Sequence, residues 1–290
     1  MAKAERVAAD AESIPYGRYY YEHDCGEPYE RTEHWLGFFR ELAGRIVDDI
    51  APKTVLDAGC AMGFLVESLR ALGVDASGID VSDYALERVD KSVEEYVSQA
   101  SLTESLPRRY DLVTCLEVLE HMPARDAERA VANICAATDQ VLFSSSPFDY
   151  AEPTHVNVRP PEEWSEMFAR HGLVRDVDFD VTTLIPWSVL YRRSDVPLPA
   201  LVRSYERTWW RLKYETRELR LEVLELQRRL EEVDWEKFRR LESELEETHH
   251  RLGEALARVN ELQQIQHQLL ETRSGRLLQT YHRVRAAFRR

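Results

Sequence analysis

The sequence predicts an α/β fold built on a mostly parallel, doubly wound sheet, and three observations lead to this prediction. Short apolar, β-prone runs alternate with helical patterns from residue 53 to about residue 194, which is typical of parallel strands joined by helical crossovers. A turn bracketed by Gly59 and Gly63 follows the first run. Asp80 ends the second run, where nucleotide-binding sheets place a carboxylate for ribose hydroxyls. We therefore expect a ribose-bearing cofactor to bind here.

Residues 1–52 form an N-terminal segment that ends in an amphipathic helix. The apolar face of this helix carries Trp35, Phe38, Phe39, Leu42, Ile46 and Ile50. Their helical spacing predicts that the helix caps one face of the sheet. A tyrosine-rich stretch precedes it at residues 16–21, followed by Tyr29 to Arg31. These two stretches either pack structurally or close over the cofactor and its acceptor, and the sequence leaves both interpretations open.

The first strand, turn, helix and second strand occupy residues 54–80. Val55 and Leu56 form a β-prone run that ends at Asp57, and a helical pattern then runs from Phe64 until Gly73 ends it. Glycines allow the backbone to approach a ligand closely. The N-terminus of the following helix offers unpaired N–H groups. This loop is the predicted cofactor-binding turn.

The rest of the sheet region continues the alternation of strands and helices. We predict helices at 82–97, capped by Ser82, and at 125–137 and 162–171, with strands near 98–100, from 110, at 140–144, and at 174–181 and 184–191. Periodicity alone supports a doubly wound sheet and does not fix the number of strands.

Residues 195–273 are predicted to be a linker followed by a long helix. Between residues 205 and 273 there is no proline and one glycine, Gly253. Apolar residues recur at spacings of four and three, and the stripe slips by one residue near Trp235: Leu219, Val223, Leu226, Leu230, Val233, then Phe238, Leu241, Leu245, Thr248, Leu252, Ala255, Val259 and Leu262. Such a narrow stripe favours a coiled coil, formed by self-association or with a partner protein. An intramolecular hairpin that turns at Gly253 is the alternative.

The last segment, residues 274–290, is basic and amphipathic. Leu277, Tyr281 and Phe288 alternate with arginines such as Arg283 and Arg289. Such a helix could lie on an anionic membrane through residues 275–290, dock onto a partner protein, or remain a solvated tail.

Composition limits the classes of function. The net charge is −14, which argues against a general nucleic-acid binder, since these usually carry a basic face. No uncharged stretch is long enough to span a bilayer, and residues 1–12 lack the apolar core of a signal peptide. The four cysteines have no metal-type spacing and are expected to be reduced thiols. We expect a cytoplasmic protein. If the basic tail binds a membrane, the protein would lie at the inner membrane face.

The motif D-x-G-C-x-x-G at residues 57–63, the G-I-D at residues 78–80 and the strand and exit loop at residues 110–122 resemble class I S-adenosylmethionine-dependent methyltransferases. The resemblance covers about residues 54–193. It implies a Rossmann-like sheet of seven strands with a closing antiparallel pair, and it implies S-adenosylmethionine as the cofactor. A cofactor-free structural domain is the less favoured alternative.

This resemblance assigns roles to individual residues. Asp57, Gly59 and Gly63 are expected to shape the pocket around the methionine end of the cofactor, and Asp80 is expected to bind its ribose. The adenine is expected beside Ser101 and Leu102, although many members of the family carry an aspartate there. Leu116, at the end of the fourth strand, is expected to pack against the cofactor.

Candidate catalytic residues follow the fourth and fifth strands. Glu117, Glu120 and His121 form an E-x-x-E-H cluster, whose spacings would bring the three side chains onto one face of a helical turn. His155 follows the fifth strand. The four side chains could ligate Mg²⁺ or Mn²⁺, as in metal-dependent RNA 2′-O-methyltransferases and ubiquinone-pathway O-methyltransferases, to which the signature is similar. Without a metal, His155 or His121 would be the base and Glu117 would orient the acceptor.

The acceptor is predicted from resemblance alone. Pro28 to Arg31, the loop at 154–158, the helix with Trp164 and Phe168, and the long helix together look like methyltransferases of bacterial surface-glycan synthesis. This predicts O-methylation of a sugar hydroxyl within a glycan-assembly complex. Two alternatives stay open: methylation of a small aromatic or quinone-type hydroxyl, and a scaffold that has lost activity and works through its coiled coil.

Overall fold

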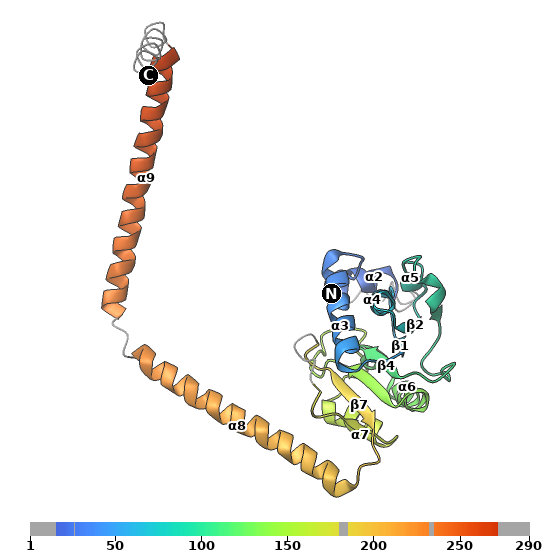
Figure 1. The fold of residues 1–290 in the computed structure, drawn as a ribbon. Coiled ribbons are helices and arrows are strands. Elements are labelled where there is room, and N and C mark those ends of the chain that lie inside the picture. The colour runs from blue at the N-terminus through green and yellow to red at the C-terminus, as the bar shows by residue number, and fades with distance from the viewer. Residues whose placement is uncertain (1–15, 26, 180–184, 232–234, 272–290) are drawn as a thin grey trace, which may run out of the picture. The chain divides into compact units, whose positions relative to one another are not determined.

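A computed structural model describes residues 16–25, 27–179, 185–231 and 235–271 (Figure 1). Its elements, in chain order, are α2 (Arg18–His23), α3 (Glu33–Asp49), β1 (Thr54–Ala58), α4 (Phe64–Ala71), β2 (Asp75–Asp80), α5 (Asp83–Leu86), η1 (Glu94–Tyr96), β3 (Val97–Gln99), β4 (Leu112–Leu116), η2 (Leu119–His121), α6 (Ala124–Ala137), β5 (Gln140–Ser144), α7 (Pro161–Ala169), β6 (Leu173–Arg175), β7 (Val189–Arg193), α8 (Leu198–Glu231) and α9 (Trp235–Glu271). The chain divides into two compact units at a boundary inside α8, between Arg211 and Leu212.

The first unit contains a seven-stranded sheet with the order β3-β2-β1-β4-β5-β7-β6. β1 lies between β2 and β4, with Leu56 aligned to Ser77 on one side and to Val113 on the other. β7 runs antiparallel to both β5 and β6. The predicted Rossmann-like sheet and its closing antiparallel pair are confirmed. Because the strand order reverses direction at β1 and β4, a crevice is expected beyond the carboxyl ends of these two strands.

The central strands are apolar on both faces, as a sheet covered by helices on each side requires. In β4, Val113 and Cys115 belong to the core beneath α6 and α7, whereas Leu112 belongs to the core beneath α3 and α4. β5 repeats the alternation, with Phe143 on the α6–α7 side and Leu142 on the other. This two-sided pattern explains why the strands read as continuous apolar runs rather than as alternating ones.

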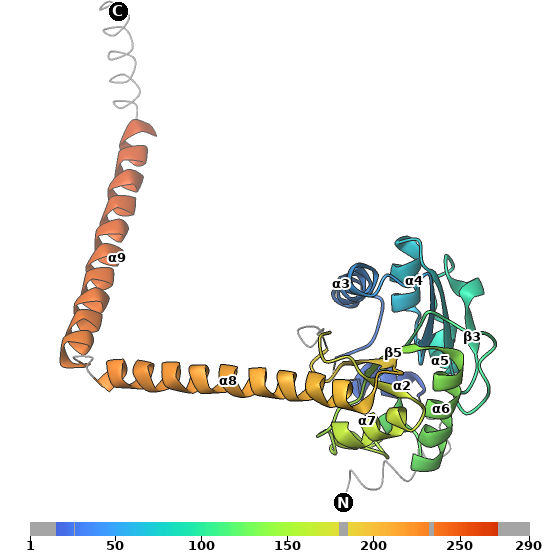
Figure 2. The same ribbon diagram turned by 60° about the horizontal axis from the view of Figure 1, so that its bottom comes forward.

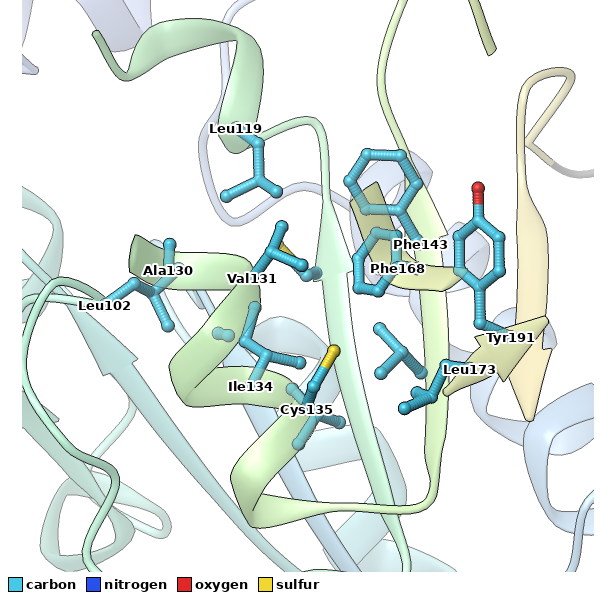
Figure 3. Close-up of a cluster of buried hydrophobic side chains, with 14 of the residues drawn as sticks. Leu102, Leu119, Ala130, Val131, Ile134, Cys135, Phe143, Phe168, Leu173 and Tyr191 are labelled. Atoms are coloured by element: carbon cyan, nitrogen blue, oxygen red, sulfur yellow. The ribbon is translucent and has the colours of Figure 1, made fainter. Parts of the chain in front are cut away.

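The core beneath α6 and α7 is rich in aromatic rings (Figure 3). Phe168 of α7 stacks on Tyr191 of β7, with ring centroids 4.3 Å apart and planes inclined by 21°. Phe143 meets Phe168 at 5.2 Å in an edge-to-face arrangement. Val131 and Ile134 of α6 are fully buried in the same cluster. Burying side chains of this size contributes about 1.5–3 kcal/mol each, so this core fixes β4 and β5, whose ends carry the site.

On the opposite face, α3 caps the sheet as predicted. The Thr32 side chain accepts a hydrogen bond from the N–H of Trp35 at the start of α3, an N-cap of the usual kind. Leu42 and Ile46 of α3 are fully buried in the same core cluster as residues of α4. The N-terminal segment is therefore joined to the sheet by a continuous apolar contact.

Two elements differ from the sequence predictions. The helix predicted at 82–97 is a single turn, α5, followed by irregular turns and η1. Ser82 does cap it, accepting from the N–H of Ala85. α5 ends at Leu86. Farther along the chain, the carboxylate of Asp90 accepts hydrogen bonds from both the backbone N–H and the hydroxyl of Ser92, a local alternative to helical hydrogen bonds at residues 90–92.

The closing strands are also shorter than predicted. β6 covers three residues and β7 five, instead of the longer runs at 174–181 and 184–191, and residues 180–184 lie outside the described part. Residues 185–188, with Pro186, form a turn before β7. Proline cannot donate a ladder hydrogen bond, so the apolar run extends beyond the strand it contains.

The second unit contains α8 from Leu212 onward and the whole of α9 (Figure 2). Gly253 lies inside α9, so the predicted hairpin turn at this residue is wrong. Large apolar side chains along both helices are exposed, among them Leu219, Phe238 and Leu245. The parts of the stripe at 232–234 and the basic tail at 274–290 lie outside the described residues, as does the predicted membrane contact. Among the described helices, none is long and apolar enough to cross a membrane.

Candidate functional site

A cavity of about 970 Å³ opens at the carboxyl ends of β1, β2 and β4. The predicted site residues that line it are Asp57, Gly59, Asp80, Ser101, Leu102, Leu116, Glu117, His121 and His155. Gly63 and Glu120 do not line it. The structure thus brings together residues that span almost one hundred positions of the chain.

The turn after β1 is shaped by backbone conformation and by Asp80. Gly59 has φ +84°, in the region that favours glycine. A Cβ at this position would lie 2.4 Å from Cγ2 of Val118. The carboxylate of Asp80 accepts hydrogen bonds from the N–H of Ala61 at 2.8 Å and from the N–H of Ser82 at 2.8 Å. Asp80 therefore holds the glycine turn against the end of β2.

Gly63 has a structural position behind this turn. It is the N-cap residue of α4 with φ +74°, and it starts the helix rather than facing the cavity.

Asp57 is a buried carboxyl at the end of β1. Its Oδ1 accepts a hydrogen bond from the Thr114 hydroxyl of β4 at 2.7 Å. Burial raises the pKa of Asp57 to about 7, opposed by the Thr114 hydrogen bond and reinforced by the charge of Asp80. A carboxyl with such a pKa gains or loses its charge near neutral pH, and it faces the cavity.

The loop after β3, the strand next to β2, also lines the cavity. The Ser101 and Thr103 hydroxyls are 2.8 Å apart, and the carbonyl of Leu102 accepts from Nδ2 of Asn133 on α6. Leu102 is buried against α6 (Figure 3). Leu116, at the end of β4, lines the same cavity. Ser101 and Leu102 thus line the cavity, and their assignment to the adenine stays a prediction.

The E-x-x-E-H cluster does not form one converging face. Glu117 has φ +52°, which turns the chain before η2, and it lines the cavity. Glu120 is instead fully buried. The N–H of Ser146 donates to Oε2 of Glu117 at 3.0 Å and to Oε1 of Glu120 at 3.2 Å. Burial, followed by the charge of the neighbouring Glu117, raises the pKa of Glu120 well above its ordinary value. Among the described residues, Oε2 of Glu120 is buried without a hydrogen-bond partner.

Both ring nitrogens of His121 are engaged. Nδ1 lies 2.9 Å from the Thr154 hydroxyl, which itself donates to a carboxylate oxygen of Glu152. Thr154 must therefore accept from Nδ1–H of His121. Nε2 of His121 lies 3.3 Å from the Tyr20 hydroxyl. Burial, followed by the charge of His155, lowers the pKa of His121 to about 4, so this imidazole is neutral at neutral pH.

His155 has the arrangement of a base. Its Nδ1 lies 2.9 Å from the backbone carbonyl of Asp149. A carbonyl oxygen only accepts, so Nδ1 carries the hydrogen and the lone pair is on Nε2. Within the described part of the chain, Nε2 has no hydrogen-bond partner. The His155 and His121 rings are 4.6 Å apart, and the His155 side chain is 8% exposed at the cavity wall.

Asn157 fixes the loop that carries His155. Its backbone N–H donates to the carbonyl of Glu120 at 2.9 Å, and its Nδ2 donates to the carbonyl of Leu119 at 3.2 Å. The two histidines therefore lie on segments joined by hydrogen bonds.

The predicted divalent-cation site does not fit these donors. Glu120 is fully buried and does not line the cavity, and each ring nitrogen of His121 lies within hydrogen-bond distance of a hydroxyl. Throughout residues 16–25, 27–179, 185–231 and 235–271, no three His, Cys, Asp or Glu side chains are placed to hold a metal ion. The positions of Glu117, Glu120, His121 and His155 therefore do not support the predicted ligand set.

Aromatic side chains from distant segments form the remaining wall. The tyrosine-rich stretch does reach the cavity, through Tyr16, Tyr20, Tyr21 and Tyr29, and Trp35, Phe38 and Phe39 of α3 line it as well. The Tyr16 hydroxyl donates to the carbonyl of His121 at 3.1 Å. Arg31 instead pairs with Glu67 of α4 at 2.6 Å, so only part of the second predicted stretch contributes.

Several lining residues escaped the sequence analysis. Ile185, Pro186 and Trp187 line the cavity from the turn before β7, and the Trp187 ring meets that of Phe148 at 5.5 Å. The sequence near Trp187 has no motif that predicts a place in the site, because the position of Trp187 depends on the antiparallel pairing of β7 with β5. All four cysteines are free; Cys25 and Cys60 line the cavity, whereas Cys115 lies in the core.

The chain is similar to known proteins over part of its length. The family described as "Methyltransferase domain" matches residues 29–176, just over half of the chain. A ubiquinone biosynthesis O-methyltransferase of Nitrosomonas europaea is 41% identical over 109 residues, covering 34% of this chain and 46% of that protein. The same-named enzyme of Paraburkholderia phytofirmans is 44% identical over 97 residues, covering 31% and 38%. The chain thus spans less than half the length of these curated relatives.

Solved structures with a similar fold include the magnesium protoporphyrin IX methyltransferase of Synechocystis PCC 6803 with bound S-adenosylmethionine. It has a TM-score of 0.46 at 18% identity and covers 66% of this chain and 96% of that chain. An amino pentose methyltransferase of Micromonospora echinaspora has a TM-score of 0.46 at 15% identity, covering 57% and 93%.

Proposed function

This chain belongs to the methyltransferase domain family, and from that premise we propose that it is an S-adenosylmethionine-dependent O-methyltransferase acting on a small aromatic or quinol-type hydroxyl. The observation that carries the proposal is the cavity itself. Its wall offers a glycine turn with the carboxylates of Asp57 and Asp80, and it also carries aromatic rings and the Nε2 of His155.

The cofactor end fits S-adenosylmethionine by its chemistry. Gly59 leaves the turn without a side chain at a point where any Cβ would meet Val118. Asp80 is placed to accept hydrogen bonds from ribose hydroxyls at the tip of β2. The ionised form of Asp57 favours a cationic ligand at the end of β1. When bound, the cofactor supplies an electrophilic methyl group on a sulfonium.

The protein's own residues prepare the hydroxyl for attack. Nε2 of His155 accepts the hydroxyl proton while the acceptor oxygen forms its bond to the methyl carbon and the carbon–sulfur bond breaks. The hydrogen bond from Nδ1 to the Asp149 carbonyl fixes the tautomer that this step needs. His121, neutral and held by Thr154 and Tyr20, packs beside that ring and keeps water away from it.

A divalent cation has no step in this proposal. Glu120 is fully buried and does not line the cavity, and each ring nitrogen of His121 lies near a hydroxyl. We assign Glu117, which lines the cavity, the role of orienting the acceptor.

The acceptor class follows from the aromatic wall. Tyr20, Trp35, Phe38 and Trp187 line the cavity, and aromatic rings favour stacked or edge-on contacts with another ring. The curated relatives are named for ubiquinone biosynthesis, which supports the same class. A sugar hydroxyl in surface-glycan synthesis is the second candidate, because Asp24, Asp126 and Asp149 line the cavity and could accept hydrogen bonds from several hydroxyls.

A matched acceptor pair tests this assignment. We expect methyl transfer to a 1,2-dihydroxybenzene to exceed transfer to cyclohexane-1,2-diol at least tenfold in kcat/KM, since only the former offers a ring to the aromatic wall. Transfer of labelled methyl from S-adenosylmethionine measures both, with a methyl glycoside as the third acceptor. Preference for the glycoside would replace the proposed acceptor by the sugar.

The inactive-scaffold alternative has its own test. Titration calorimetry with S-adenosylmethionine should show stoichiometric binding to the full chain. No binding heat at any temperature, with the protein folded, would favour a scaffold that works through its long helices.

Cofactor affinity should depend on pH through Asp57. The pKa of Asp57 is raised to about 7, so the carboxyl becomes protonated as pH falls, and a bound cation requires it to lose that proton. The dissociation constant of S-adenosylmethionine should therefore be about tenfold higher at pH 6 than at pH 7.5. Asp57→Asn, which keeps an oxygen that can accept from Thr114, should bind more weakly at pH 7.5 and lose this pH dependence. If the dissociation constant changes equally with pH in the unaltered protein and in Asp57→Asn, the assignment is contradicted.

A further inference from the structure

The exposed stripe on α8 consists of Leu212, Thr216, Leu219, Val223 and Leu226 and has the spacing of a coiled-coil seam. We propose that residues 212–229 form a parallel, in-register, two-stranded coiled coil with a second copy of this chain, which tethers two methyltransferase domains at the same end of the coil. This inference does not depend on the acceptor or on the catalytic base.

The stripe is apolar, regular and exposed. Leu212, Leu219 and Leu226 are seven residues apart and alternate with Thr216 and Val223. The exposed fractions of Leu219 and Val223 are 62% and 52%. Exposing such a row to water is costly, since each buried methylene contributes about 0.8 kcal/mol. A stripe this narrow matches the seam of a two-stranded coil rather than the face of a globular core.

The residue types on the stripe favour two strands. With the leucines at heptad position d, the β-branched residues Thr216 and Val223 occupy position a. β-Branched residues at a with leucine at d favour parallel dimers. The same helix shows Leu221 and Leu224 outside the stripe, and a larger assembly would be needed to bury them as well.

Charges on the two flanks of the stripe select the orientation. Position e carries Lys213, Arg220 and Gln227, and position g carries Glu215, Glu222 and Arg229. In an antiparallel pair, position e faces position e of the partner and position g faces position g. At the middle of the stripe, Arg220 would then face Arg220 of the second copy and Glu222 would face its Glu222. In a parallel pair g meets e of the partner. Glu215 then lies opposite Arg220 of the second copy, and Glu222 lies opposite its Gln227.

Glu215, Arg220 and Glu222 lie outside the ion pairs found within α8. The pairs Arg217–Glu218 and Arg228–Glu225 lie away from the stripe and its flanks. Within the described part of the same chain, Glu215, Arg220 and Glu222 make no ion pair. The charges that remain are the ones that a parallel partner would use.

Cross-linking of the full chain tests the orientation. In a Cys25→Ser background, Leu219→Cys should form an intermolecular disulfide under mild oxidation, because position d residues of parallel, in-register chains face each other. Leu221→Cys, two residues away and outside the stripe, is the matched control and should stay monomeric on a denaturing gel. If Leu219→Cys links only after mixing with Val223→Cys, the helices are antiparallel and the proposal is wrong.

Two further measurements complete the test: the mass of the assembly in solution, and the effect of reversing the charges at residues 215 and 220. Analytical ultracentrifugation should give twice the mass of the 33.8 kDa chain, and a monomer, trimer or tetramer would overturn the proposal.

Glu215→Arg should raise the dimer dissociation constant about tenfold by placing like charges opposite each other. Adding Arg220→Glu to it should restore dimerisation, because the pair is then reversed rather than lost. No recovery in the double variant would contradict the parallel register. Unchanged cofactor binding serves as the folding control.

Discussion

His155→Asn is expected to lower kcat by a factor of about 10² to 10⁴ while leaving S-adenosylmethionine affinity unchanged, since general-base catalysis contributes an effect of this size. The asparagine amide reproduces the donor at Nδ1 that bonds the Asp149 carbonyl and removes Nε2. Single-turnover methyl transfer measures the chemical step, and calorimetry measures the affinity.

A matched variant separates chemistry from structure. His121→Asn keeps the donor to Thr154. It loses the hydrogen bond with Tyr20 and the ring contacts with Tyr16, Tyr20 and His155, none of which takes a proton from the acceptor, so kcat should fall less than about tenfold. A merely structural role for His155 would give equal losses in both variants. Partial rescue of His155→Gly by added imidazole would support a base at that position, whereas a full loss of cofactor binding in His155→Asn would refute the assignment.

The cofactor end of the site could be read from the sequence because its determinants are local. Asp57, Gly59 and Asp80 lie within one strand–turn–helix–strand unit, so their spacing along the chain fixes their positions in space. The structure places all three at one cavity. Ser101 and Leu102 could be placed at the same cavity for the same reason, since they follow β3, the strand next to β2.

The acceptor end could be predicted only in part. Glu117, Glu120 and His121 fit a helical turn by spacing, yet the positive φ of Glu117 and the 3₁₀ geometry of η2 turn Glu120 into the core. Spacing rules assume one regular helix, so they fail at a strand exit with a left-handed residue. Trp187 could not be found at all, because its position depends on the pairing of β7 with β5.

The helix predicted at 82–97 fails for a different reason. The apolar spacing there is real, but the Asp90 side chain bonds the N–H and hydroxyl of Ser92. Asp and Ser compete with helical hydrogen bonds in this way, and a periodicity argument does not weigh that competition.

Gly59→Ala should weaken S-adenosylmethionine binding by a factor of about 100 or more, because overpacking of about 1–3 kcal/mol adds to left-handed strain of about 1–2 kcal/mol. The new methyl group would lie 2.4 Å from Cγ2 of Val118, and Val118 lines the cavity. To relieve the clash, either the turn or Val118 must move into the space for the cofactor.

Gly63→Ala is the control that isolates this clash. Gly63 has φ +74°, close to the +84° of Gly59, but its new Cβ would lie 3.5 Å from Cγ1 of Val89, an ordinary contact. Both variants carry the strain of a left-handed alanine, so Gly63→Ala should lower the melting temperature and weaken binding by no more than about tenfold. Combining Gly59→Ala with Val118→Ala removes the clashing methyl groups and should recover most of the lost affinity. Equal losses in both glycine variants, or no recovery in the double variant, would mean that strain rather than the cavity wall governs binding at this turn.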